Sequence, residues 1–295
     1  MRTLRPNWPV YLISRIKRGQ WLVSERYAED MAPFVADLLL GKTPGSPSLD
    51  DIRILASEDG EHFSPESDNS ARDYVAIVPI CGTMLKYGTL CTAGTIDVAE
   101  SLQRLAVKTD CSAVVLDIDS GGGCTDSIPC LVDAIDSCHR NGKPVVASVD
   151  FCASAAYWVA SYCDHIMAQN TLSSEIGSIG AYATFVDDRG ANEKAGLKFH
   201  YIYPPESADK NLMYRNALDG DFEMLASRVS DLAVRFQNTV KRNRKKLRMD
   251  VDGLLTGKMF CAEDALSAGL IDSIGNLSEA VRMAMDLAEI RKFNQ

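Results

Sequence analysis

The fold is decided by thirteen residues in the middle of the chain, Val149-Asp150-Phe151-Cys152-Ala153-Ser154-Ala155-Ala156-Tyr157-Trp158-Val159-Ala160-Ser161. The apolar run that leads into them, residues 145–149, predicts a strand, and the run after Ser154 predicts a helix. A serine at a strand-to-helix turn presents its hydroxyl at a helix N-terminus, where free backbone N–H groups and the helix dipole can hold an oxyanion. On this stretch alone, the simpler interpretation is a serine that caps the helix beside packed alanines.

Composition limits the function classes. The chain has 295 residues, of which 46% are hydrophobic and 24% charged, as expected of a globular protein with a full core. A net charge of -9 argues against a general nucleic-acid binder. The sequence has no apolar run of the length that a membrane span needs, and its first residues lack the pattern of a signal peptide. We therefore expect a cytoplasmic protein.

Cysteine and histidine usage points to neither disulfides nor a metal centre. The nine cysteines are scattered without a CxxC pair, which favours reduced thiols. The four histidines show no ligand spacing with the cysteines, so we expect no metal site and no cofactor.

The chain divides into three parts. Residues 1–45 have a helical pattern, with apolar residues spaced three and four apart between Met31 and Leu39, and predict an N-terminal helical arm. Residues 46–72 are rich in Pro, Ser, Asp, Glu and Gly and predict a linker. The main domain is expected over residues 73–290.

The main domain alternates strands with helices. Strands are predicted at 74–80, 113–118, 145–149 and 164–168, with helices at 95–107 and 127–139 between them. This order implies crossover units and an α/β core with a buried parallel sheet. Farther along, the patterns predict a helix at 187–196, a strand at 199–203, a long amphipathic helix at about 219–247, and helices at 262–268 and 278–290.

Two glycine-rich loops accompany the serine turn. Asp119-Ser120-Gly121-Gly122-Gly123 follows a buried strand but lacks the spacing of a phosphate-binding loop. It is equally suited to offer backbone N–H groups to a carbonyl oxygen or to form a tight structural turn. By itself, Ile176-Gly177-Ser178-Ile179-Gly180 indicates a structural turn.

A nucleophilic serine needs a base. His62, His139, His165 and His200 are not embedded in catalytic motifs. A lysine can serve when burial favours its neutral amine. Lys210 lies in a polar loop between Ser207 and Asn211, although a lone loop lysine is usually a solvated surface charge. Lys86, after the first strand, is the reserve candidate.

Four motifs in order resemble peptidase family S49, the signal peptide peptidase A-like serine proteases, and in particular its short phage and prophage members. Residues 118–123 look like the family's Asn-Ser-Pro-Gly-Gly loop, and residues 151–160 look like its nucleophile turn. Residues 176–180 match its Thr-Gly-Ser-Ile-Gly segment, and residues 255–275 match its closing signature. The resemblance covers about Tyr74 to Met285. Gly121 replaces the loop proline, and Ala155-Ala156 replace paired glycines.

The resemblance implies a Clp/crotonase-like α/β fold with repeated β-β-α crossover units, and a Ser–Lys dyad. Ser154 carries over as the nucleophile, and the N–H groups of Gly122 and Ala155 as the oxyanion hole. Lys210 is the lysine nearest the family's Gly-Lys-x-Lys segment, whose pattern is not kept here. The Clp relatives place a Ser-His-Asp triad on the same architecture, for which His165 is the candidate.

The implied function is a serine endopeptidase that acts on protein or peptide substrates. The N-terminal arm and short length resemble phage head maturation proteases, which cleave scaffold or capsid proteins inside the prohead. A catalytically inactive assembly protein on the same fold is the alternative, and a crotonase-type acyl-CoA enzyme has less support. Apolar stripes on the N-terminal arm and the long helix predict a homo-oligomer.

Overall fold

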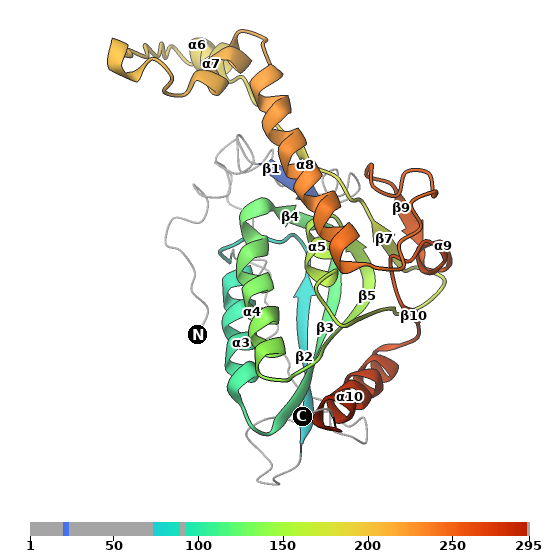
Figure 1. Cartoon of the computed structure of the whole chain (residues 1–295). Coiled ribbons are helices and arrows are strands. Elements are labelled where there is room, and N and C mark those ends of the chain that lie inside the picture. Colours follow the sequence, from blue (N-terminus) through green and yellow to red (C-terminus); the bar gives the residue numbers. More distant parts are fainter. Residues whose placement is uncertain (1–19, 24–72, 89–92, 294–295) are drawn as a thin grey trace.

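A parallel sheet forms the centre of the molecule. The computed structural model describes residues 20–23, 73–88 and 93–293. Five parallel strands run in the order β10-β6-β5-β3-β2. Their bounds are β2 Tyr74–Cys81, β3 Cys111–Ser120, β5 Val145–Ala153, β6 His165–Ala168 and β10 Ser273–Ile274. Strand order departs from chain order, so the connections are the crossovers that the sequence predicts (Figure 1).

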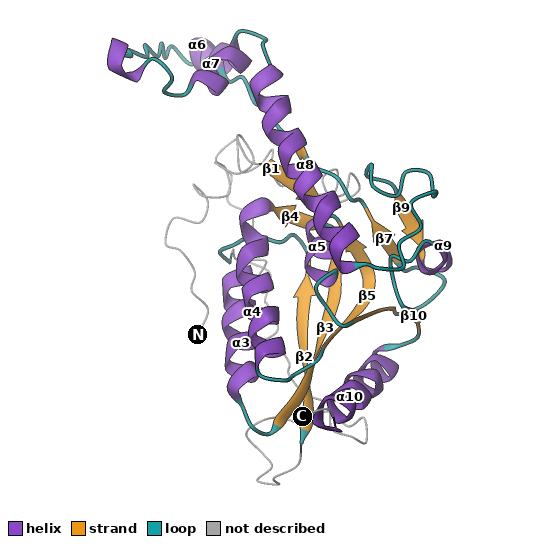
Figure 2. Ribbon diagram, viewed as in Figure 1, coloured by secondary structure: helices purple, strands orange, loops and turns teal. Residues whose placement is uncertain are grey.

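Helices cover both faces of this sheet. Side chains alternate along β3, so that Val114 and Leu116 share one buried cluster and Ala113 and Val115 another. The first cluster includes residues of α3 (Thr95–Val107) and α4 (Ile128–Arg140), and the second includes residues of α10 (Leu277–Phe293). Figure 2 shows α3 and α4 on one side of the strands and α10 on the other.

Shorter strands extend the sheet around the serine turn. β7 (Glu175–Gly177) pairs in parallel with the end of β5 and antiparallel with β9 (Met259–Cys261). A separate antiparallel sheet has the order β4-β1-β8, built from Gly122–Cys124, Gln20–Val23 and Tyr182–Ala183. The register of β3 and β5 shifts between Ile118 and Ser120, a type of irregularity that often re-aims residues beside active sites.

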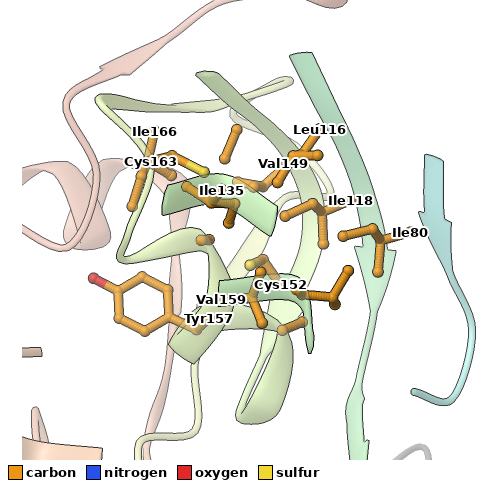
Figure 3. Close-up of a cluster of buried hydrophobic side chains, with 14 of the residues drawn as sticks. Ile80, Leu116, Ile118, Ile135, Val149, Cys152, Tyr157, Val159, Cys163 and Ile166 are labelled. Atoms are coloured by element: carbon orange, nitrogen blue, oxygen red, sulfur yellow. The ribbon is translucent and has the colours of Figure 1, made fainter. Parts of the chain in front are cut away.

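The short helix that follows Ser154 is anchored to the core by its side chains. α5 (Ala155–Ala160) brings Tyr157 into the buried cluster of Figure 3, and the Tyr157 hydroxyl donates a 2.7 Å hydrogen bond to the Leu270 carbonyl. Trp158 stacks on Phe236 of α8 (Glu223–Asn243), with ring centroids 4.5 Å apart. These contacts fix the position of α5 from two sides.

An arm projects from the body of the molecule. It carries α6 (Arg189–Lys194), the 3₁₀ turn η2 (Pro205–Ser207) and α7 (Leu212–Leu218) at the N-terminal end of α8 (Figure 1). The remaining helical elements, η1 (Thr125–Ser127) and α9 (Ala262–Ser267), lie in the body. None of the helices in the described ranges is long and apolar enough to cross a membrane.

The structure confirms the α/β class and corrects two predicted elements. Residues 199–203 form no strand, because Phe199, Tyr201 and Ile202 are exposed on the arm and pair with no neighbouring strand. The long helix begins at Glu223 instead of about 219, since α7 ends at Leu218 and a turn at Gly220 separates the two helices. The predicted linker and most of the N-terminal arm lie outside the described residues, and the described piece, Gln20–Val23, is a strand.

Candidate active site

Ser154 occupies a strained turn between β5 and α5. Its backbone has φ 57° and ψ -116°, a conformation that L-residues rarely adopt and that costs about 1–3 kcal/mol. The Ser154 N–H donates a 2.9 Å hydrogen bond to the Gly177 carbonyl of β7, which holds the turn from the neighbouring strand. Strain of this kind persists only where the surroundings impose it, and it is concentrated at active sites.

The Ser154 hydroxyl does not cap the helix. No side-chain cap hydrogen bond forms at Ser154, and no partner for its Oγ is found within the described ranges. The residue is only 1% exposed. The capping interpretation of the sequence is therefore wrong. The hydroxyl belongs to a buried residue and makes no hydrogen bond to the described part of the chain.

A backbone N–H lies free beside this hydroxyl. Ala155 is the first residue of α5, so its N–H has no intrahelical acceptor, and the described residues supply no other. A Cβ built on Gly122 would stand 2.8 Å from the Ala155 nitrogen. The glycine loop and the serine turn are thus packed backbone to backbone, as an oxyanion site requires.

The glycine loop is fixed by Ser120. The Ser120 hydroxyl donates a 2.6 Å hydrogen bond to the Gly82 carbonyl and accepts one of 3.2 Å from the Gly122 N–H. Gly122 has φ 95°, a value that favours glycine. The Gly122 N–H, predicted as an oxyanion donor, is therefore engaged by Ser120 in this structure, and its role stays a prediction.

Lys210 does not lie beside Ser154 in the same chain. It is an exposed residue of the arm, between η2 and α7. The helix that carries the arm contacts α5 at Phe236, thirteen residues after its start at Glu223, which is about 20 Å along the helix axis. Figure 1 shows α7 at the far end of α8 from α5.

The reserve lysine lies nearer to the glycine loop. Met84 pairs with the loop, donating to the Gly122 carbonyl at 2.8 Å and accepting from the Cys124 N–H at 2.9 Å. Lys86 follows two residues later, half-buried, with its Nζ 5.5 Å from the centroid of the Tyr87 ring.

The histidine alternative fails on position. His165 pairs with Val146 at the start of β5, roughly 25 Å from the turn at about 3.3 Å per residue. Its Nε2 lies 2.7 Å from the Ser273 hydroxyl, and burial lowers the pKa of its imidazole. His139 forms an ion pair with Asp164, and His200 lies exposed on the arm. None of these three can complete a triad with the Ser154 of the same chain.

Sequence reasoning misses two contributors to the site. The pattern around Gly177 indicates only a structural turn, but its carbonyl anchors the Ser154 N–H and its φ of 135° admits this geometry. The Gly-x-x-Gly spacing of Gly177 and Gly180 is the feature of the sequence that could have indicated this role. The strand Gln20–Val23 beside the glycine loop has no signal, because its run of three apolar residues fits a helix equally well.

The structure brings together part of the predicted machinery. Ser154, Ala155 and Gly122 meet at one point, and Lys210 does not join them. No set of three or more His, Cys, Asp or Glu side chains that could hold a metal ion occurs among residues 20–23, 73–88 and 93–293. The chemistry that the arrangement allows is attack by a hydroxyl next to an unpaired backbone donor.

Comparison with known proteins places this chain in a family. The profile of Peptidase family S49 matches residues 138–291, just over half of the chain. Protease 4 of Haemophilus influenzae is 28% identical over 229 residues, which cover 74% of this chain and 35% of that protein. Capsid assembly protease C of Escherichia phage lambda is 25% identical over 240 residues, covering 77% of this chain and 53% of that protein.

Solved structures show the same kind of similarity. A mutant of the 1510-N membrane-bound stomatin-specific protease is 17% identical with a TM-score of 0.40, covering 70% of this chain and 83% of that chain. An enoyl-CoA hydratase from Polaromonas sp. JS666 is 18% identical with a TM-score of 0.43, covering 74% and 78%. These likenesses concern the fold alone, and the α/β class itself rests on the strand order and crossovers described above.

The chain spans only about a third to two fifths of the length of several curated relatives. The family profile nevertheless includes Ser154, the Gly177 anchor and the closing helices. The chain belongs to peptidase family S49, a family of serine peptidases.

Proposed function

We propose that this chain is a serine endopeptidase in which Ser154 is the nucleophile. The observation that carries the proposal is the strained turn, which holds an uncapped hydroxyl beside the N–H of Ala155, a donor that no described residue accepts. Ser154 Oγ attacks a peptide carbonyl, and the carbonyl oxygen gains negative charge against the Ala155 N–H and the glycine loop. The base takes the proton of the Ser154 hydroxyl and gives it to the leaving amine as the peptide C–N bond breaks. Water then hydrolyses the acyl-enzyme ester, which releases the acid product and restores the Ser154 hydroxyl.

Lys210 is proposed as the base, supplied by a neighbouring copy of the chain. The arm extends Lys210 away from its own body, so it can reach only a serine that another copy presents. The exposed Phe199, Tyr201 and Ile202 on the same arm provide apolar surface for that contact. Such a contact also removes water from the amine, which favours the neutral form that accepts a proton.

The biological role proposed is phage or prophage head maturation, with scaffold or capsid protein as substrate in the cytoplasm or the assembling prohead. The relative from phage lambda, 25% identical, supports this role, whereas the more similar Protease 4, 28% identical, is its bacterial counterpart. Cleavage of a co-expressed phage scaffold or coat protein by the wild type, and not by Ser154→Ala, tests it.

An inactive assembly protein is the second candidate, favoured by the separation of Lys210 from Ser154 in one chain. One experiment separates the two. Purified chain is incubated with a pool of unstructured peptides, and the products are identified by mass spectrometry, with Ser154→Ala as the control. Cleavage that disappears in the variant supports the peptidase, and the absence of cleavage at all concentrations tested supports the inactive protein.

A further inference from the structure

The strand β1 fills a slot between two strand edges. Gln20–Val23 pairs antiparallel with β4 on one side and antiparallel with β8 on the other. The pairing joins Leu22 to Gly123 and Val23 to Gly122, so β1 lies directly on the glycine loop. Without it, the facing edges of β4 and β8 would expose unpaired backbone groups, which is the arrangement that binds extended peptides by strand addition.

The Leu22 carbonyl lies at the candidate oxyanion site. A Cβ built on Gly122 would stand 2.1 Å from the Leu22 oxygen and 2.8 Å from the Ala155 nitrogen. These two distances place the Leu22 oxygen no more than 4.9 Å from that nitrogen. The Leu22 carbonyl oxygen therefore lies close to the N–H group that the proposed mechanism assigns to the carbonyl of a substrate.

The side chains of β1 are buried as a bound ligand would be. Trp21, Leu22 and Val23 are 6%, 0% and 8% exposed. Leu22 belongs to the same buried cluster as Met84, Ile128 and Ala155, the residue that follows Ser154. Three apolar side chains and the backbone pairing on two sides hold this short strand in place.

We propose that Gln20–Val23 is an intrachain pseudosubstrate, which occupies the peptide-binding slot of the Ser154 site and must leave before a substrate binds. The inference rests on the proposed peptidase function and adds its regulation. It also assigns the ligand chemistry of the slot: an extended peptide whose backbone pairs with β4 and β8, with a bulky aliphatic side chain at the position of Leu22.

The first test displaces the strand in the full chain. Leu22→Asp places a charge at a fully buried position and should release β1 from the slot. If the slot is closed most of the time, opening it should raise kcat/KM for a long peptide reporter by about tenfold. The rate at which a fluorophosphonate labels Ser154 should rise by a similar factor. Leu172→Asp introduces the same charge at a side chain that is 96% exposed and should leave both rates unchanged.

The second test adds the strand back. A synthetic peptide with the sequence of residues 18–25 should inhibit Leu22→Asp competitively, raising KM without changing kcat, and a peptide with Asp in place of Leu should not inhibit. This measurement also works on the wild type, so it remains decisive if Leu22→Asp fails to fold. Circular dichroism establishes whether the variant is folded.

The outcomes separate this inference from the proposed function. Equal rates for folded wild type and Leu22→Asp, with no inhibition by the peptide, would overturn the pseudosubstrate while leaving the peptidase intact. Cleavage of the chain between Leu22 and Val23 by its own Ser154 would also overturn it, since the strand would then be a substrate. If wild type and variant alike neither cleave nor label, the proposed function itself is wrong.

Discussion

At the scale of single residues, the backbone of Ser154 stores strain that only a function would retain. Its φ of 57° and ψ of -116° are stabilised by the hydrogen bond to Gly177 and by the packing of Gly122 against Ala155. The Ser154 hydroxyl makes no capping hydrogen bond, and the N–H of the next residue, Ala155, has no acceptor among the described residues. The same turn therefore accounts for both the strained backbone of Ser154 and the position of its hydroxyl.

Replacement of Ser154 by glycine should separate these two features. Ser154→Gly removes the hydroxyl and relieves the positive φ, so we expect no turnover together with an increase in Tm of about 2 °C. Ser154→Ala should be equally inactive without that increase. Thermal unfolding of the three proteins checks this. A lower Tm for Ser154→Gly than for Ser154→Ala would show that the turn is not strained.

The glycine loop offers a second residue-scale prediction. Gly122→Ala would bring a Cβ within 2.1 Å of the Leu22 oxygen and 2.8 Å of the Ala155 nitrogen, at φ 95°. We expect the loss of peptidase activity and a destabilisation of several kcal/mol, because backbone atoms cannot give way. Gly220→Ala is the matched control, since Gly220 has a similar φ of 86° with nothing within 4 Å. Equal urea unfolding curves for both variants would refute the close packing of the loop.

At the scale of elements, the C-terminal end of α8 is joined to the strand β6 through one ion pair. Arg244 donates to both oxygens of Asp272 at 2.8 and 2.9 Å, and Asp272 also accepts the Ile166 N–H at 2.9 Å. The Arg244 side chain is buried and that of Asp272 is largely so. This pair anchors the helix that carries the arm.

Removing the carboxylate should destabilise the chain strongly. Burial alone would raise the pKa of Asp272, but the hydrogen bonds and charge of Arg244 outweigh it and hold that pKa below its ordinary value. Asp272→Asn leaves the guanidinium buried without its counter-charge, at a cost of about 3–5 kcal/mol at neutral pH. Because the pKa is lowered in the folded state, this stabilisation is present above the ordinary carboxyl pKa and is lost as the pH falls through the lowered value.

Urea unfolding at neutral pH and at about pH 3 measures this effect, and the gap between wild type and Asp272→Asn should narrow in acid. Asp250→Asn removes an exposed partner of Arg248 and should unfold close to the wild type at both pH values. A gap for Asp272→Asn that widened in acid would contradict the direction of the pKa shift.

Most elements of the core could be predicted from the sequence, whereas on the arm the helix α6 could be predicted and the rest could not. The helix at 95–107 and the strand before Ser154 could be predicted from their apolar patterns, because both elements pack their apolar side chains into the core. The stretch from Phe199 to Tyr203 has the composition of a strand but no edge to pair with, and pairing is a property of tertiary structure. The separation of Lys210 from its own Ser154 could not be predicted for the same reason, because no local pattern reports how far an arm extends.

At the scale of the whole molecule, one chain holds Ser154 in its body and Lys210 on its arm. The body is a sheet covered on both faces, whereas the arm exposes Phe199, Tyr201 and Ile202. An active site built from both parts requires at least two copies. We therefore expect a homo-oligomer by light scattering, and a monomer at high concentration would contradict this expectation.

Mixing two inactive variants tests the shared site. Ser154→Ala retains Lys210, and Lys210→Ala retains Ser154, so a mixed oligomer should contain complete sites and recover about a quarter of the wild-type peptidase rate. Neither variant alone should turn over substrate. If mixing after dissociation and reassembly restores nothing, Lys210 does not act between copies.

A conservative substitution tests Lys210 as the base. Lys210→Arg should be nearly as inactive as Lys210→Ala, because a guanidinium stays protonated and cannot accept the serine proton. Retained activity in a folded Lys210→Arg would exclude Lys210 as the base, and Lys86→Ala would then be the variant to measure.

The nucleophile is the central claim, and covalent labelling tests it most directly. The wild-type chain is treated with a fluorophosphonate, digested, and mapped by mass spectrometry. The account predicts one adduct per chain, located on Ser154, with none in Ser154→Ala. An adduct on any other residue, or labelling that persists unchanged in Ser154→Ala, would contradict it.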